Sequence, residues 1–162
     1  MKNVIVVLAM VAVVMGVDVK GYVTGDTLSD SLRNTAIMDS AGIVVFDETL
    51  GGIEGIIMCG IVSDGRVHTI MFTPNGRIYT VEEERLASGI MLRYGIKLDK
   101  RSQNEYSSDY FRSTTKNGTE FFMMAEHNSY IDKPVKLQVI FRDTELSKIY
   151  DSEKSIESSE DF

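Results

Sequence analysis

The sequence of 162 residues has one cysteine, two histidines and fewer cationic than acidic residues. A single cysteine, Cys59, excludes a disulfide bond within the chain. Lysine and arginine together number 17 against 24 aspartates and glutamates, which gives a formal net charge of −7. Because phosphate contacts need clustered cations, this balance argues against a nucleic-acid partner and against adhesion to anionic lipid. It favours solubility and, at most, a cationic partner.

Recognisable catalytic and metal-binding motifs are also missing. No Gly-x-Ser-x-Gly nucleophile elbow occurs, and the glycine-rich segment 51–55 lacks the Gly-Lys-Ser/Thr of a phosphate-binding loop. His68 and His127 lie far apart with no cysteine cluster; His127 with Glu126 would be the candidate pair if a metal were bound. Cys59 has apolar neighbours on both sides, which is typical of a buried structural thiol. The sequence therefore predicts no catalytic residue, no metal site and no cofactor.

The first feature that the sequence does contain is a pattern that predicts an export signal. Residues 1–3 carry one positive charge, residues 4–15 form an unbroken apolar run, and Gly16 supplies a small residue for cleavage. This order is typical of a secretory signal peptide, and the run is short for a transmembrane helix, which needs about 20 apolar residues. An uncleaved anchor or a buried first strand is the alternative. We expect a signal peptide at residues 1–16, a mature chain in the periplasm or outside the cell, and membrane contact only during export.

The remaining sequence contains an internal repeat at a constant offset of 53 residues. Thr27 and Thr80 each precede an acid by three residues, as helix N-caps do, and Gly42 and Gly95 are placed to end the two helices. Apolar stripes at helical spacing support both helices, with Ala87, Ile90, Met91 and Tyr94 in the second and, more weakly, Leu28, Leu32 and Ala36 in the first.

Two hairpin turns recur at the same offset. Asp64-Gly65 and Asn117-Gly118 each lie between strand-like runs, and these dipeptides favour tight β-hairpins. Further strands are predicted at Val44–Phe46, before the Leu50-Gly51-Gly52 turn, and at Val135–Phe141, after Pro134.

We therefore expect an α+β fold built from two tandem helix-plus-β-hairpin units, about residues 22–74 and 75–127, with a final strand at residues 135–141. The strands would form an antiparallel sheet with both helices packed on one face. The single domain would span residues 17–150. The Ser- and Glu-rich residues 151–162 are expected to form a disordered acidic tail.

Two tandem units of a helix followed by antiparallel strands, behind a signal peptide, resemble the β-lactamase inhibitor protein-like architecture of small exported bacterial proteins. The resemblance covers about residues 22–145. In its second half the helix ends in Leu92-Arg93-Tyr94-Gly95, and Ile140-Phe141-Arg142-Asp143 lies near the C-terminus. The resemblance implies a concave sheet face that binds another protein. This chain departs from the architecture in having no disulfide pair, and no inhibitory residue carries over.

The segment Phe121-Phe122-Met123-Met124 is apolar on both faces of its expected strand, whereas a half-buried strand would alternate. A central strand covered on both sides is one explanation, and a sheet face used by a partner is the other. We place the candidate partner-binding residues here. The expected function is that of a non-enzymatic exported protein that binds another envelope or secreted protein through its sheet face. A hydrolase without a recognisable motif and a small-ligand carrier are the alternatives.

Overall fold

The computed structural model describes residues 16–40, 42–102, 109–114, 118–126 and 136–160. The apolar run of the predicted signal peptide lies outside these residues, so that segment stays a prediction. Among the described helices, none combines the length and the apolar character needed to cross a membrane.

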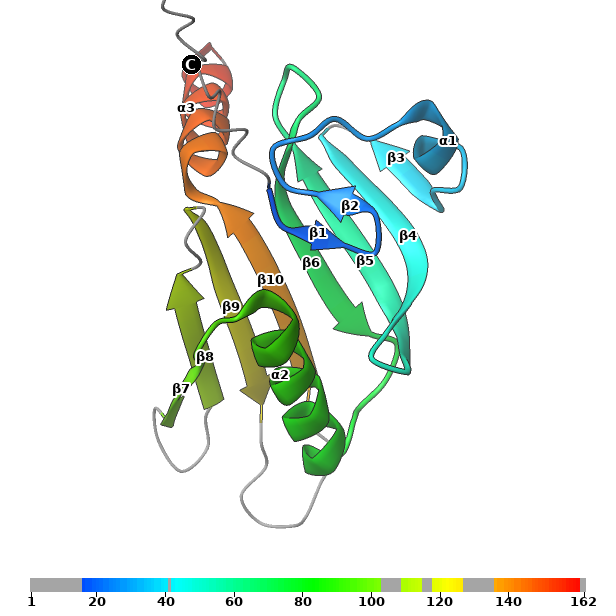
Figure 1. Cartoon of the computed structure of the whole chain (residues 1–162). Helices are drawn as coiled ribbons and strands as arrows, with labels where there is room; N and C mark the ends of the chain where they lie inside the picture. Colours follow the sequence, from blue (N-terminus) through cyan, green and yellow to red (C-terminus); the bar gives the residue numbers. More distant parts are fainter. Residues whose placement is uncertain (1–15, 41, 103–108, 115–117, 127–135, 161–162) are drawn as a thin grey trace, which may run out of the picture.

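Eight strands form one antiparallel sheet, shown in Figure 1, in the order β3 (Met38–Ser40), β4 (Ile43–Leu50), β5 (Ile53–Ile61), β6 (Val67–Pro74), β10 (Lys136–Asp143), β9 (Thr119–Glu126), β8 (Asp109–Thr114) and β7 (Asp99–Ser102). A small second sheet pairs β1 (Asp18–Val19) with β2 (Tyr22–Val23). The helices are α1 (Asp30–Arg33), α2 (Thr80–Tyr94) and α3 (Thr144–Glu160). The predicted α+β class and antiparallel sheet are confirmed.

The hydrophobic core lies between the sheet and the elements on one of its faces, where α2 and the β1–β2 hairpin are found (Figure 1). Alternate positions of the central strands supply its largest fully buried side chains, including Phe46, Ile57, Ile70, Phe72, Phe121, Met123 and Phe141. Helix α2 contributes Leu86, Ala87 and Ile90. Burying a side chain of this size contributes about 1.5–3 kcal/mol, so these residues together stabilise the fold strongly.

Helix α2 forms close to where its sequence predicts. Gly95 ends the helix in the left-handed conformation, with φ 62°, as expected for a C-terminal glycine. At the other end the N-cap is Tyr79, one residue before the predicted Thr80. The backbone N–H of Tyr79 donates to the Glu82 carboxylate at 2.8 Å. Glu83, predicted to be the capping acid, is instead buried, with 1% of its surface exposed.

The first predicted helix, from Thr27 to Gly42, is wrong in both start and length. Only Asp30–Arg33 is helical, and Ser29 is its N-cap. The chain then enters β3, which pairs with the edge of β4. Backbone pairing with an existing strand therefore overrides the weak helical stripe, although Leu32 still packs against the core.

The strands predicted around the turns are confirmed. Asp64 and Gly65 lie in the loop that joins β5 to β6, with φ 89° at Gly65, and the Asp64 carboxylate accepts a hydrogen bond from the Arg66 backbone N–H at 3.1 Å. Leu50-Gly51-Gly52 joins β4 to β5. Strands β8 and β9 pair as expected, while residues 115–117 between them lie outside the described residues.

Helix α3 replaces most of the tail that was predicted to be disordered, so that prediction is wrong for residues 151–160. The Asp143 carboxylate accepts hydrogen bonds from the first turn of α3, including one from the Leu146 N–H at 3.0 Å. Leu146 is buried, and the Glu153 carboxylate accepts hydrogen bonds from the backbone and hydroxyl of Ser63. A cap, an apolar anchor and a tertiary contact thus order a segment whose composition suggested disorder.

The two halves of the sheet meet in a way that the constant offset did not predict. Each half supplies a helix followed by four antiparallel strands, and the last strands of the halves, β6 and β10, pair at the centre. By position in the sheet β6 therefore matches β10, whereas an offset of 53 residues aligns β6 with β9. The tandem-unit description is not confirmed.

Candidate functional site

The four residues predicted to bind a partner point to opposite faces of β9. Phe121 and Met123 are fully buried in the core, at 0% exposure, so neither lies on an accessible surface and both are removed from the candidate site. Phe122 and Met124 are half-buried on the other face. The burial of side chains along β9 therefore does alternate. The sequence does not show this alternation because the side chains on both faces of the strand are apolar.

The second face carries an apolar band that runs straight across five strands. Its members stand directly opposite one another in successive strand pairs: Val45, Met58, Met71, Ile140 and Phe122. Side chains directly opposite in antiparallel strands lie about 4.5–5.5 Å apart at their Cβ atoms, so the five form a continuous apolar row. We call this set the apolar band.

Most of the apolar band is only partly shielded from solvent. Val45, near the sheet edge, is 5% exposed, while the other four members are half-buried. Polar residues border the band in the same strands. Arg142 and Glu120 face each other on one side, and the Arg142 guanidinium lies 5.6 Å from the centre of the Phe122 ring. The band therefore has an apolar centre with a polar rim.

Helix α3 packs against this face where β6 begins. The His68 ring stacks on Tyr150, with 4.4 Å between ring centres and an angle of 20°. The ring occupies space above Gly60, since a Cβ atom at residue 60 would lie 2.6 Å from His68 Nε2. A glycine at this position is therefore needed for His68 and α3 to dock.

The environment of His68 favours the neutral form of its imidazole. Burial lowers the pKa of His68 below 6.5, and the nearby Arg142 guanidinium acts in the same direction. The carboxylates of Asp151, Asp143 and Glu153 oppose these two effects without reversing them. Nδ1 lies 2.9 Å from the Thr69 hydroxyl. These contacts account for His68 as a structural residue of the α3 interface.

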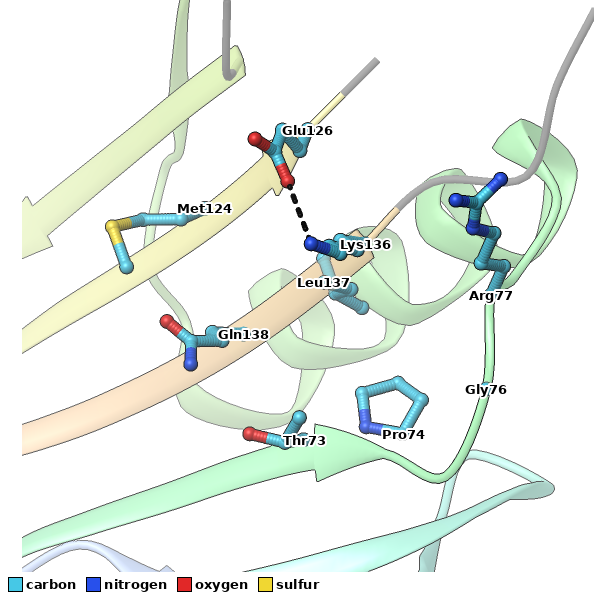
Figure 2. Close-up of a pocket in the computed structure, with 9 residues that line it drawn as sticks. All are labelled: Thr73, Pro74, Gly76, Arg77, Met124, Glu126, Lys136, Leu137 and Gln138. Atoms are coloured by element: carbon cyan, nitrogen blue, oxygen red, sulfur yellow. Dashed lines mark ion pairs between the residues drawn. The ribbon is translucent and has the colours of Figure 1, made fainter. Parts of the chain in front are cut away.

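On the side opposite Arg142, the apolar band is bordered by a pocket of about 490 Å³, the β6–β10 pocket (Figure 2). Pairing of β6 with β10 ends at Phe72 and Val139, so the two strands diverge beyond this point and leave the pocket between them. Its lining residues are Thr73, Pro74, Gly76, Arg77, Met124, Glu126, Lys136, Leu137 and Gln138. The Lys136 ammonium lies 3.6 Å from the Glu126 carboxylate at its rim.

Groups that could carry out catalysis or hold a metal do not converge on this face. Cys59 is fully buried, as its neighbours predicted, and burial raises the pKa of its thiol to about 12. Within the described residues, no three histidine, cysteine or acidic side chains are placed to bind a metal ion. His127 lies outside the described residues. The chemistry that this face offers is apolar contact with a polar border.

Sequence reasoning found Phe122 of the apolar band and its neighbour Met124, and missed the other four members of the band. Val45, Met58, Met71 and Ile140 belong to the apolar band but were assigned no role. The pattern that reveals them is the same one seen in β9, because Ile56-Ile57-Met58 and Val139-Ile140-Phe141 are also apolar on both faces of their strands.

No family model, curated protein or solved structure matches this chain. The resemblance to the β-lactamase inhibitor protein-like architecture therefore stays a prediction.

Proposed function

We propose that this chain is a non-enzymatic exported protein that binds another envelope or secreted protein through the apolar band. The observation that carries the proposal is the register of Val45, Met58, Met71, Ile140 and Phe122, which gathers five apolar side chains from five strands on one face. An apolar centre with a polar rim is the usual composition of a protein–protein interface. Methionines are well suited to such a surface because their unbranched side chains adapt to a partner.

In this proposal the two tandem units, about residues 22–74 and 75–127, and the final strand at residues 135–141 act as one platform. Because β6 and β10 pair at the centre of the sheet, the band crosses from one unit to the other without a break. The β6–β10 pocket beside the band adds a recess that accepts a protruding partner side chain.

The charge of the chain sets the chemistry of the partner. A net charge of −7 attracts a partner that surrounds its own apolar centre with lysine and arginine. Association of this kind slows as salt screens the charges, over a Debye length of about 10 Å at 0.1 M ionic strength. The proposed partner is thus a protein with a basic rim.

Affinity capture from the envelope fraction of the host tests the proposal, with the full chain expressed with its own N-terminus and tagged at its C-terminus. The band variant Phe122→Asp/Met124→Asp is compared with Leu92→Asp, which changes an apolar residue of α2 that is 87% exposed and lies off the band. A discrete protein is expected to bind the native chain and Leu92→Asp, to be lost with the band variant, and to protect β5, β6, β9 and β10 from amide hydrogen exchange. Equal capture by the band variant, or protection confined to other elements, overturns the proposal.

A further inference from the structure

A second concave site lies on the opposite face of the sheet and is lined by residues of α2, the β1–β2 hairpin and the turn between β4 and β5. Figure 1 shows α2 and the hairpin on that face. Its volume is about 410 Å³, within the range of about 300–1,000 Å³ that is usual for small-molecule sites. We call it the α2 pocket. It shares no lining residue with the apolar band or with the β6–β10 pocket.

The inner part of the α2 pocket is apolar. Val19, Leu86, Ile90 and Phe141 line it, and each is at most 5% exposed. Tyr94 also lines the pocket, and its hydroxyl already donates to the Asp18 carbonyl at 2.7 Å. The surface offered to a ligand at this depth therefore accepts a hydrocarbon body.

The rim of the α2 pocket is cationic. Lys20, Arg85 and Arg93 line it, and no acid does so among the described residues. Lys20 is held by Glu48, with 2.6 Å between Nζ and Oε2. Within the described part of the chain, Arg85 and Arg93 form no ion pair. In a chain of net charge −7, two guanidinium groups with no acidic partner among the described residues form a local site for an anion.

Helix geometry places the two arginines on either side of an opening. Arg85, Gly89 and Arg93 follow one another at intervals of four residues, so they lie along one side of α2. Gly89 has no side chain to close the space between them, and a Cβ atom built there meets nothing within 4 Å. The opening of the pocket thus lies between two cations.

We infer that the α2 pocket binds a small amphiphilic anion, with its apolar body among Val19, Leu86, Ile90 and Phe141 and its carboxylate or phosphate on Arg85 and Arg93. A guanidinium donates two parallel hydrogen bonds to either group, so both head chemistries fit. The inference is independent of the apolar band, and a loss of partner binding there leaves it unchanged.

Titration calorimetry with the purified full chain tests the inference, below the concentration at which the probes form micelles. The probes are decanoate, decyl phosphate and the neutral decanol. Decanoate or decyl phosphate is expected to bind at one site, with the tighter of the two identifying the head group, and decanol to bind about tenfold more weakly because it lacks the charge-assisted hydrogen bonds. Heat no greater than dilution for both anions overturns the inference.

Two variants locate the binding. Gly89→Leu places a side chain in the opening, and leucine is a better helix former than glycine, so the folded state is maintained. It is expected to abolish binding. Arg85→Gln/Arg93→Gln keeps the apolar interior and is expected to weaken anion binding about tenfold while leaving decanol unchanged. Leu92→Gln, on the exposed side of α2, is the matched control and binds as the native chain does. Unchanged anion binding in both pocket variants overturns the inference.

Discussion

Met71 of β6 stands directly opposite Ile140 of β10, at the only four-residue stretch where the described halves of the sheet pair. This contact joins an apolar row from β4 and β5 to another from β9, so the band exists because the two halves meet in this register. A shift of one residue would turn every side chain of one half to the other face. The position of β10 therefore determines both the core and the proposed binding surface.

Replacing the two neighbouring phenylalanines of β9 should reduce the stability of the chain by different amounts. Phe121→Ala removes a buried ring that lies 4.9 Å from the ring of Phe141, and it should lower the free energy of unfolding by about 3–5 kcal/mol. Phe122→Ala acts on the half-buried face and should cost clearly less while weakening partner capture. Urea denaturation of both variants measures the difference. Equal losses of stability would contradict the assignment of Phe122 to an accessible face.

Gly60 should be intolerant of any side chain. In Gly60→Ala the new methyl group meets the His68 ring, and we expect the free energy of unfolding to fall by about 1–3 kcal/mol because the ring and α3 must move. Gly76→Ala is the matched control, since a Cβ atom there has no neighbour within 4 Å. Thermal unfolding of the two variants provides the comparison. Equal melting temperatures would show that His68 does not lie over Gly60.

His68 should make the chain less stable in acid. Its pKa in the folded state is below 6.5, so the unfolded chain binds more protons as the pH falls. The contribution of neutral His68 to the free energy of unfolding is therefore complete above about pH 6.5 and is progressively lost as the pH falls below that value. His68→Gln removes this effect, so the native chain should lose more stability than the variant between about pH 7.5 and about pH 5.5. The same loss in both proteins would rule out His68 as the cause.

The thiol of Cys59 should not react in the folded chain. Its side chain is fully buried and burial raises its pKa to about 12, so neither access nor thiolate is available near neutral pH. A chromogenic disulfide reagent should label the native chain far more slowly than the chain in guanidinium, because the reagent reaches the thiol only when the core opens. Rapid native labelling would contradict the core position of Cys59.

Much of the fold could be predicted because its turns and caps are local. Gly95 ends α2 by its own backbone freedom, and Asp64-Gly65 joins two strands whatever the rest of the chain does. The prediction of the first helix was wrong because residues 38–40 form backbone hydrogen bonds with the neighbouring strand β4. Such pairing cannot be recognised from the local sequence pattern. The prediction of a disordered tail was wrong because the Glu153 carboxylate accepts a hydrogen bond from Ser63, far away in the sequence, and Leu146 of the same helix is buried.

The candidate site could be predicted only in part, because it too depends on contacts between residues that are distant in sequence. An apolar run such as Phe121-Phe122-Met123-Met124 indicates that both faces of a strand are apolar, but not which residue lies on which face. Which residues face the core depends on the face against which α2 packs. Phe121 lies on that face, where its ring contacts the ring of Phe141. Met71 and Ile140 become neighbours only when β10 pairs with β6, across 69 positions of sequence (140 − 71).

The measurement that tests the central claim most directly is site-specific photocrosslinking in the host, with a photoreactive side chain at Ile140 in the apolar band or at Leu92 on α2. Ile140 should yield a crosslink to one discrete envelope or secreted protein, suppressed by Phe122→Asp in the same chain, and Leu92 should yield none. Crosslinks from Leu92 alone, from both positions alike, or from neither would contradict a binding role for the apolar band.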